Sequence, residues 1–322
     1  MYDASAQSRA TLSHSVTLQI NGFAVSGSIE NDQAMITRGW VWMIVIFVFY
    51  ASYSCTPSGA KVDPPLADQT ALPTSKASSD NMSSEKGPSA NPAKGPKKEV
   101  PILCYHRIRE WRNADSRSSK NYIIPPDVFR SHIKMLADSG YHAILPDQLL
   151  DHMVFGDSLP AKPVMLTFDD GSLGQYAIGA KVLEKYGFRG VFFIMTIAMN
   201  KTDYISSSQL REMAENGHVI GSHTWDHKNV LKYEPADWPV QLKGSVASLE
   251  KATGKPVRYF AYPYGSWNAN AITYLKQYGF RAAFTLGVKP SEKEPLHTIS
   301  RINIPGYWSA EMVSAHLGKH FP

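Results

Sequence analysis

Residues 163–171, PVMLTFDDG, decide the fold more than any other stretch of the sequence. An apolar run of strand length ends there in two adjacent carboxylates, Asp169 and Asp170, and a glycine follows them. In parallel α/β proteins the carboxyl ends of the strands carry the active site. Two neighbouring carboxylates repel each other unless a proton or a cation lies between them. Because Asp-Asp-Gly is also common turn chemistry, this stretch alone leaves a plain turn and a functional site equally open.

Apolar runs of this kind alternate with amphipathic stretches on both sides of residues 163–171. The sequence predicts strands at 100–105, 163–168, 189–195, 218–222, 257–262, 281–286 and 298–304. It predicts helices at 126–138, 175–186, 207–216, 237–253, 268–278 and 309–317. Such alternation indicates a parallel α/β architecture. We expect one domain, residues 100–322, folded as a distorted or incomplete β/α barrel, with an open doubly wound sheet as the second choice.

A second polar stretch, GSHTWDH at 221–227, also follows a predicted strand. His223 and His227 are four residues apart, and a helical turn or a tight loop can direct such a pair at one cation. With one carboxylate they form a two-histidine, one-carboxylate set, which leaves positions open for water and substrate. A pair of ordinary surface histidines is the plain alternative, but the Asp-Asp pair makes it harder to sustain.

A third stretch, YFAYPYG at 259–265, closes another predicted strand. Its aromatic side chains fit the core of the domain. They also fit the wall of a sugar site, since sugars stack on aromatic rings.

TFDDG, H-T-x-x-H and Y-P-Y-G, in this order, resemble the polysaccharide deacetylases of carbohydrate esterase family 4, over about residues 100–305. The resemblance implies a polysaccharide-deacetylase barrel in which Asp169 is the general base. It implies that Asp170, His223 and His227 bind a metal ion and that the backbone N–H of Tyr264 contacts the oxyanion. The residues expected along the sugar are Trp225, Tyr262, Pro263 and Tyr264.

Two positions depart from the common family pattern. Many members carry an arginine in the third motif, where this chain has Ala261, and many carry an acid histidine in a C-terminal Leu-x-His motif that we do not find here. One branch, which includes deacetylases of poly-β-1,6-N-acetylglucosamine, takes the acid histidine from the first strand and has F-A-Y-P-Y-G as its third motif. The opening PILCYHRI at 101–108 resembles that branch, which implies His106 as the general acid and points to Arg301 as the missing arginine.

Chemistry leads to the same set of roles. Amide hydrolysis needs an activated water, a polarised carbonyl and a proton for the leaving amine. A divalent metal on the three candidate ligands would supply the first two, and His106 could supply the proton. Zinc is the first choice of metal, with nickel, cobalt or another ion possible on such ligands. His106 could instead cap its strand, and Arg301 could be a structural salt-bridge residue.

The N-terminal third reads as an export segment and a tether. Residues 1–34 are a poorly defined extension, and Met35 is an alternative start. Within 35–55, Arg38 precedes the apolar run WVWMIVIFVFYA, which is short for a membrane span and fits a signal peptide. Cys55 then resembles a lipoprotein processing site, with an uncleaved anchor as the alternative. Residues 56–99 are rich in Pro, Ser, Lys, Ala and Asp and indicate a flexible linker.

Composition narrows the function classes. The net charge of +5 depends partly on lysines at 91–98, inside the linker, and there is no zinc-finger or RNA-binding signature, so we do not expect nucleic-acid binding. We expect an exported or membrane-anchored enzyme of the cell envelope that removes N-acetyl groups from a polysaccharide, with poly-β-1,6-N-acetylglucosamine first. The alternatives are a deacetylase of peptidoglycan, chitin oligomers or acetylxylan, a non-catalytic carbohydrate-binding protein, and an adhesion or scaffold protein.

Overall fold

The computed structural model describes residues 16–20, 23–27 and 99–321, and its contacts divide the chain into two units. In the first unit, β1 (Val16–Ile20) pairs antiparallel with β2 (Phe23–Gly27), where the sequence predicts no element. The signal or anchor expected at 35–55 lies outside the described residues, as does all but the last residue of the linker expected at 56–99. Of the helices that are described, none combines the length and the apolar character that crossing a bilayer requires.

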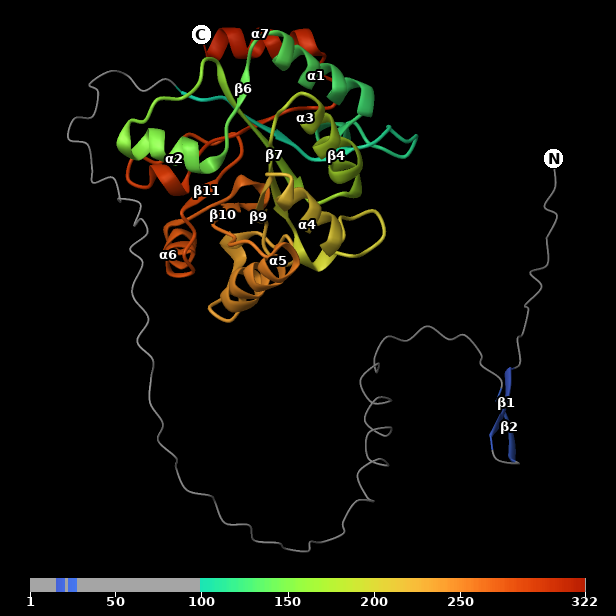
Figure 1. The fold of residues 1–322 in the computed structure, drawn as a ribbon. Coiled ribbons are helices and arrows are strands. Elements are labelled where there is room, and N and C mark those ends of the chain that lie inside the picture. Colours follow the sequence, from blue (N-terminus) through green and yellow to red (C-terminus); the bar gives the residue numbers. More distant parts are fainter. Residues whose placement is uncertain (1–15, 21–22, 28–98, 322) are drawn as a thin grey trace, which may run out of the picture. The chain divides into compact units, whose positions relative to one another are not determined.

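The second unit is built around one sheet whose main path runs β11-β10-β9-β8-β7-β3-β12, and every pairing along this path is parallel (Figure 1). Its strands are β3 (Ile102–Tyr105), β7 (Pro163–Asp170), β8 (Val191–Ile194), β9 (Val219–Ser222), β10 (Tyr259–Ala261), β11 (Ala282–Phe284) and β12 (Ile302–Asn303). Off this path, β6 (His142–Ala143) pairs with β7. A separate parallel pair joins β4 (Arg107–Ile108) to β5 (Ile123–Ile124).

One short segment, residues 299–303, closes the sheet into a distorted barrel. Ile299 bridges to Phe284 of β11, and Ile302 and Asn303 pair with β3. The segment thus contacts both ends of the strand path. The sequence predicts a regular strand over 298–304, but only two residues form one, because the segment changes partner midway. The distorted β/α barrel expected from the sequence is confirmed, and the open sheet is not.

The two faces of the sheet bury different sets of side chains. Residues that alternate with period two along neighbouring strands share a face, so Ile102, Met165 and Phe193 line the inside of the barrel, where they belong to one core cluster. Their neighbours in sequence face the helices and belong to a larger cluster. Asp169 is four residues beyond Met165 on β7 and therefore projects toward the barrel interior.

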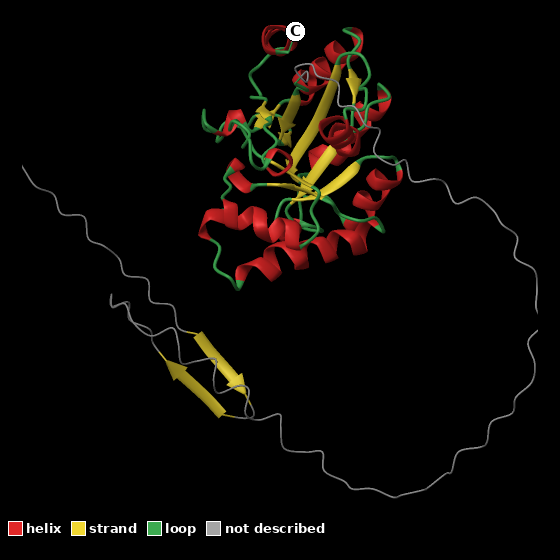
Figure 2. Ribbon diagram, turned by 90° about the vertical axis from the view of Figure 1, so that its left-hand side faces the viewer, coloured by secondary structure: helices red, strands yellow, loops and turns green. Residues whose placement is uncertain are grey.

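Helices surround the sheet, as Figure 2 shows. They are α1 (Pro126–Asp138), α2 (Pro146–Phe155), α3 (Lys181–Lys185), α4 (Ser207–Glu215), α5 (Ser245–Thr253), α6 (Ala269–Gln277) and α7 (Ala310–His320). The predicted helices at 175–186 and 237–253 are present, but each begins with a π-helical segment. These segments are Gln175–Ala180 before α3 and Pro239–Gly244 before α5. α2 lies where no helix is predicted, although Pro146 at its first turn is a typical helix-start signal.

His218, which precedes β9, is buried between the strands and α3. Its Nδ1 accepts a hydrogen bond of 3.0 Å from the Gly190 N–H, and its Nε2 lies 3.3 Å from a Glu184 carboxylate oxygen. Burial disfavours the charged imidazolium and lowers the pKa of His218 to about 4. Protonation of Nδ1 would also replace its hydrogen bond from the Gly190 N–H with a repulsive contact between two N–H groups.

The lowered pKa predicts a pH-dependent stability. His218 contributes stability that is fully present above its unfolded pKa of about 6.5 and is lost as the pH falls toward 4. The free energy of unfolding of the full chain, measured in urea, should decline between pH 7 and pH 4. We expect this decline to be shallower in His218→Gln by up to about 1.4 kcal/mol per pH unit, the value for one proton. Equal slopes for the two proteins would contradict this assignment.

Candidate active site

The candidate site lies at the carboxyl ends of the barrel strands. Asp169 and Asp170 end β7, His223 follows β9 directly, and His106 follows β3 directly. Tyr264 lies in the turn after β10. Residues spread from 106 to 301 therefore come together because parallel strands all end on the same side of the sheet.

A buried ion pair fixes Asp169. Both guanidinium NH₂ groups of Arg301 donate to its carboxylate, at 2.6 Å and 2.7 Å, and neither residue is more than 2% exposed. The Nε of Arg301 donates to the Thr285 carbonyl at 3.0 Å, and the guanidinium lies over the ring of Phe193. Such a two-point contact fixes both the position and the plane of the carboxylate.

The charge state of Asp169 follows from this pair. Burial is the largest single influence and by itself would raise the pKa of the carboxyl group. The charge and hydrogen bonds of Arg301, together with the nearby His223 and His106, outweigh burial and hold the pKa below its usual range. Asp169 is therefore a carboxylate at neutral pH. Its Oδ2 lies 4.0 Å from Nε2 of His106 and 3.9 Å from Nε2 of His223, so it stands between these two histidines.

Asp170, His223 and His227 form a compact group of potential metal ligands. Nε2 of His223 lies 3.6 Å from Oδ1 of Asp170, and Nε2 of His227 lies 3.5 Å from the same oxygen. One donor atom from each residue lies within 4.8 Å of the others. The positive φ of Asp170, 77°, breaks the extended conformation of β7 at its last residue, so that this carboxylate leaves the alternation that Asp169 obeys.

The surroundings of His223 fix both its tautomer and its charge state in the form that binds a metal ion. Its Nδ1 lies 2.7 Å from the Ala261 carbonyl, so this nitrogen carries the hydrogen and Nε2 keeps its lone pair. Burial lowers the pKa of His223 to about 4, which leaves the ring neutral at physiological pH. A neutral imidazole, a second imidazole and a carboxylate are a donor set that zinc and similar divalent ions accept, so the residues fit a metal ion.

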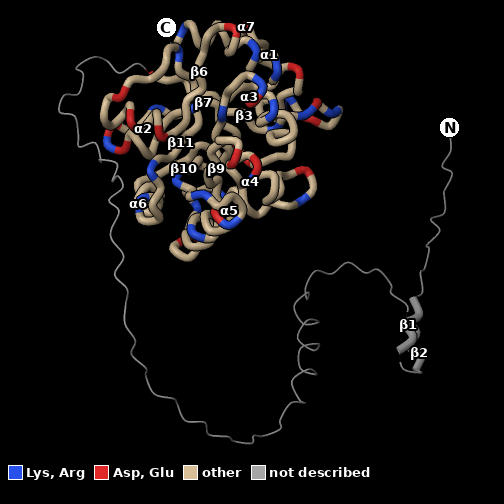
Figure 3. The backbone as a smooth tube through the Cα atoms, viewed as in Figure 1, with Lys and Arg blue, Asp and Glu red and all other residues tan. Residues whose placement is uncertain are grey.

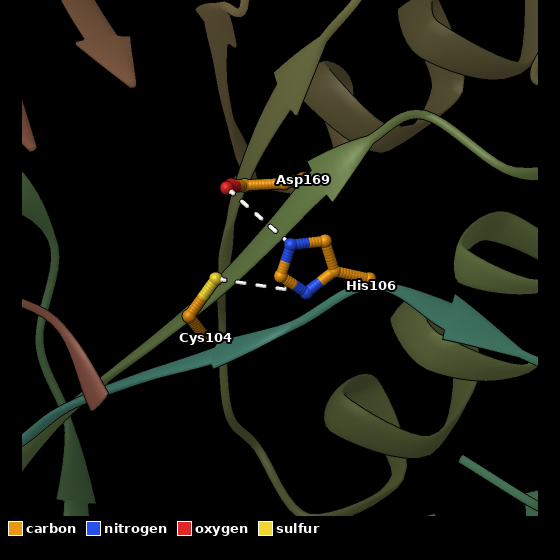
Figure 4. A group of neighbouring side chains, drawn as sticks. All are labelled: Cys104, His106 and Asp169. Carbon is orange, nitrogen blue, oxygen red and sulfur yellow. Dashed lines mark hydrogen bonds and ion pairs between the residues drawn. The ribbon is translucent and has the colours of Figure 1, made fainter. Parts of the chain in front are cut away.

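A second group of potential metal ligands consists of Cys104, His106 and Asp169 (Figure 4). Both carboxylate oxygens of Asp169 already accept from Arg301. Burial raises the pKa of the Cys104 thiol well above its usual value, so it stays protonated and is a poor ligand. A cation here would also face the Arg301 guanidinium. The chemistry therefore favours the Asp170 group as the metal site.

The loop that carries both histidines is held by Gln241, a residue that no sequence motif singles out. The Gln241 side-chain oxygen accepts from the backbone N–H groups of Trp225 and Asp226, at 3.2 Å and 3.4 Å. Thr224 and His227 both have positive φ, 68° and 66°. The two histidines thus share one face through a strained loop rather than through a helical turn.

His106 occupies the place that the first-strand assignment requires. β3 pairs with β7, and Tyr105 is opposite Phe168, so His106 emerges level with Asp169. Nε2 of Gln175, a second residue that was missed, donates to the His106 carbonyl at 2.7 Å and to the Asp169 carbonyl, and it ties the two strand ends together. His316 lies instead on α7, in contact with Trp308 and His320.

Of the four residues expected along the sugar, two are buried and two are exposed. Tyr262 is 1% exposed and donates its hydroxyl to the His297 carbonyl at 3.1 Å, and Pro263 is also buried, so both belong to the core. Tyr264 is 65% exposed, and its ring lies edge-on to His227 with 4.6 Å between centroids. Trp225 is 39% exposed. Of these four expected residues, only Tyr264 and Trp225 can therefore present a ring to a ligand.

Comparison with known proteins identifies the class. Residues 156–283 match the family model described as polysaccharide deacetylase. The chain therefore contains a polysaccharide deacetylase domain, as its motifs predict, and the family match and the relatives indicate a deacetylase enzyme.

Individual relatives agree with this class. YxkH of Bacillus subtilis, whose name places it among polysaccharide deacetylases, is 25% identical over 221 residues, 68% of this chain and 76% of the relative. A poly-beta-1,6-N-acetyl-D-glucosamine N-deacetylase of Staphylococcus aureus is 27% identical over 58% of this chain and 72% of its own length. The solved structure of IcaB from Ammonifex degensii superimposes with a TM-score of 0.57 at 28% identity and covers 68% of this chain and 96% of that one.

The Arg301–Asp169 pair generates a test that separates catalysis from stability. Asp169→Asn leaves the Arg301 charge buried and unpaired, so we expect the free energy of unfolding to fall by about 3–5 kcal/mol. Turnover per folded molecule should fall by about 10²–10⁴-fold, with bound metal retained. Adding Arg301→Gln removes the orphan charge and should recover part of the stability but none of the turnover. Recovery of both would make Asp169 a structural residue.

Proposed function

We propose that this enzyme removes N-acetyl groups from an N-acetylglucosamine polymer of the cell surface or extracellular matrix, with poly-β-1,6-N-acetylglucosamine as the first candidate. The observation that carries the proposal is the arginine-held carboxylate of Asp169 beside three potential metal ligands. The Staphylococcus aureus relative named for this polymer supports the choice of substrate. The F-A-Y-P-Y-G motif, resembling the same branch, supports it independently.

A divalent metal, with zinc before nickel or cobalt, would be held by Asp170, His223 and His227. When bound, it lowers the pKa of a water molecule and polarises the amide carbonyl. The protein would contribute two imidazoles and one carboxylate, and the Nδ1 contact of His223 with the Ala261 carbonyl leaves its Nε2 free to bind the ion.

The remaining residues handle protons and charge. Asp169, kept ionised by Arg301, accepts a proton from the attacking water at a carboxylate oxygen. His106 delivers a proton from Nε2 to the departing nitrogen, because this atom faces Asp169 across 4.0 Å while Nδ1 faces the Cys104 thiol. The backbone N–H of Tyr264 stabilises the developing oxyanion, an effect commonly worth about 3 kcal/mol.

We also propose that the enzyme is exported and tethered. The apolar run within 35–55, flanked by Arg38, would direct export, and lipidation of Cys55 would attach the chain to a membrane. Residues 56–99 would then let the domain reach a polymer outside the cell. The Staphylococcus aureus relative is named for a polysaccharide substrate, which is consistent with this location.

The metal assignment predicts that a variant losing a ligand loses bound metal and activity together. Asp170→Ala, His223→Ala and His227→Ala should each lose bound metal, measured by elemental analysis, together with acetate release, because each removes one of three ligands. His320→Ala removes an exposed histidine at the chain's end and serves as the control. Full activity of exhaustively metal-free protein would contradict the assignment.

His106→Ala tests the general acid. We expect folding and metal content to stay intact while turnover falls by about 10²–10⁴-fold, with thermal melts and initial rates as the measurements. His316→Ala on α7 is the matched control and should leave turnover unchanged. Loss of turnover in His316→Ala but not in His106→Ala would show that the first-strand assignment is wrong.

Acetate release from a panel of glycans tests the substrate. We expect poly-β-1,6-N-acetylglucosamine to be hydrolysed with a higher kcat/KM than chitin oligomers, peptidoglycan or acetylxylan. A clear preference for one of the other three would replace the substrate while keeping the reaction class. No release from any of them by metal-loaded protein would contradict the proposed function itself.

A further inference from the structure

Tyr122 presents an exposed aromatic ring beside the candidate general acid. The residue is 47% exposed, and its ring lies edge-on to the ring of His106, with 4.9 Å between the centroids and 74° between the planes. It follows the short 3₁₀ helix Ser119–Asn121 and belongs to none of the three motifs. The contact with His106 therefore leaves much of an aromatic side chain accessible at the edge of the site.

The backbone that carries Tyr122 is held from two sides. Its carbonyl accepts a hydrogen bond of 2.9 Å from the Arg107 N–H, next to the pairing of β4 with β5. The carbonyl of the preceding residue, Asn121, accepts from the side chain of Asn303 on β12 at 3.0 Å. A tyrosine has few rotatable bonds, and a ring whose backbone is already fixed loses little conformational entropy when a ligand binds.

Exposed tyrosines flank the functional side chains at both ends. On one side, Tyr122 contacts His106, whose Nε2 lies 4.0 Å from Asp169. On the other side, the ring of Tyr264, which is 65% exposed, lies 4.6 Å from the ring of His227. The candidate acid and the candidate metal group therefore each have an exposed aromatic ring beside them.

The proposed reaction places the sugar on the His106 side of the site. Hydrolysis of an N-acetyl group breaks the bond between the carbonyl carbon and the nitrogen, so that acetate leaves and the nitrogen stays on the sugar ring. The residue that protonates this nitrogen must therefore lie next to the sugar, whereas the metal and the Tyr264 N–H hold the acetyl group. A ring in contact with His106 is consequently beside the sugar.

The distribution of charge gives such an aromatic contact more weight. In Figure 3, Lys and Arg positions are interspersed with Asp and Glu positions over the second unit (Figure 3). Fully N-acetylated glucosamine polymers are neutral, so long-range electrostatic attraction does not hold them. Their affinity must come from short-range contacts, and the C–H faces of sugar rings stack on aromatic side chains.

We propose that Tyr122 is a specificity residue whose exposed ring stacks on the sugar unit that carries the reacting N-acetyl group. This role rests on the proposed deacetylation and adds to it a substrate contact outside the three motifs. A flat ring beside the acid fits the face of a neutral cyclic hexosamine, and an acetylated compound without a sugar ring would gain nothing from it.

Steady-state kinetics of the metal-loaded full chain on β-1,6-linked oligomers of N-acetylglucosamine test the contact. We expect Tyr122→Ala to raise KM about three- to tenfold, the scale of one aromatic contact, with kcat nearly unchanged. Tyr122→Phe and Tyr122→Trp keep a flat ring and should stay near the KM of the parent protein. Tyr122→Leu fills much of the same space without a flat face and should resemble Tyr122→Ala.

A role limited to orienting His106 predicts a different pattern. Loss of the tyrosine ring would then lower kcat instead of raising KM and would shift the alkaline limb of the pH–rate profile. Leucine would restore most of the activity, because it still packs against the imidazole. That pattern would overturn the sugar contact.

Phe155→Ala is the matched control. Phe155 is a 59% exposed aromatic residue at the end of α2, a helix that contacts the amino end of β10 through Asp147 and Tyr259, away from the carboxyl ends that carry the site. We expect its KM to equal that of the parent protein. A rise in KM equal to that of Tyr122→Ala would overturn the specific role of Tyr122.

A binding measurement separates the sugar contact from the proposed function. Isothermal titration of the same oligomers into chelator-treated full chain measures affinity without turnover. Weaker binding by Tyr122→Ala than by Phe155→Ala supports the contact even if no glycan releases acetate. Unchanged binding and unchanged KM in Tyr122→Ala, together with normal acetate release, overturn the contact and leave the deacetylase in place.

Discussion

The ion pair between Arg301 and Asp169 is the constraint on which the rest of the site depends. The two residues are 132 positions apart in the sequence, and both are almost completely buried. Each buried charge would be severely unfavourable without the other. The pair can form only if residues 299–303 lie beside β3, which is itself paired with β7, so closing the barrel and holding the candidate base are one structural event. The same pair keeps Asp169 ionised although burial favours its neutral form.

Backbone geometry positions the three candidate metal ligands, Asp170, His223 and His227, beside the carboxylate of Asp169. Positive φ values at Asp170, Thr224 and His227 turn their side chains away from the direction that extended strands would give them. Such conformations are unfavourable for residues other than glycine, and here they occur together at one end of the barrel. The side chains of Gln241 and Gln175 each hold the surrounding backbone through two hydrogen bonds. The strained positions are thus concentrated where the proposed chemistry takes place.

The sequence predicts the barrel class and most of the strands, because buried apolar runs alternate with amphipathic helices over a long stretch. It also singles out Asp169, Asp170, His223 and His227, since each lies just after an apolar run. Arg301 could be assigned only through a resemblance, because its partner is distant in the chain and no local pattern marks it. Gln175 and Gln241 were missed for the same reason: each looks like an ordinary polar residue of a helix until the fold brings its partners to it. Tyr262 shows the opposite error, an aromatic expected at the sugar site that the alternation of β10 turns into the core.

The most direct test of the account is the position of the metal. Anomalous X-ray scattering from crystals of the zinc-loaded protein, recorded on both sides of the zinc absorption edge, locates the ion without reference to activity. The account predicts one peak within about 2.3 Å of a carboxylate oxygen of Asp170 and of Nε2 of both His223 and His227, with Asp169 still held by Arg301. A peak among Cys104, His106 and Asp169, or no peak beside Asp170, would contradict it.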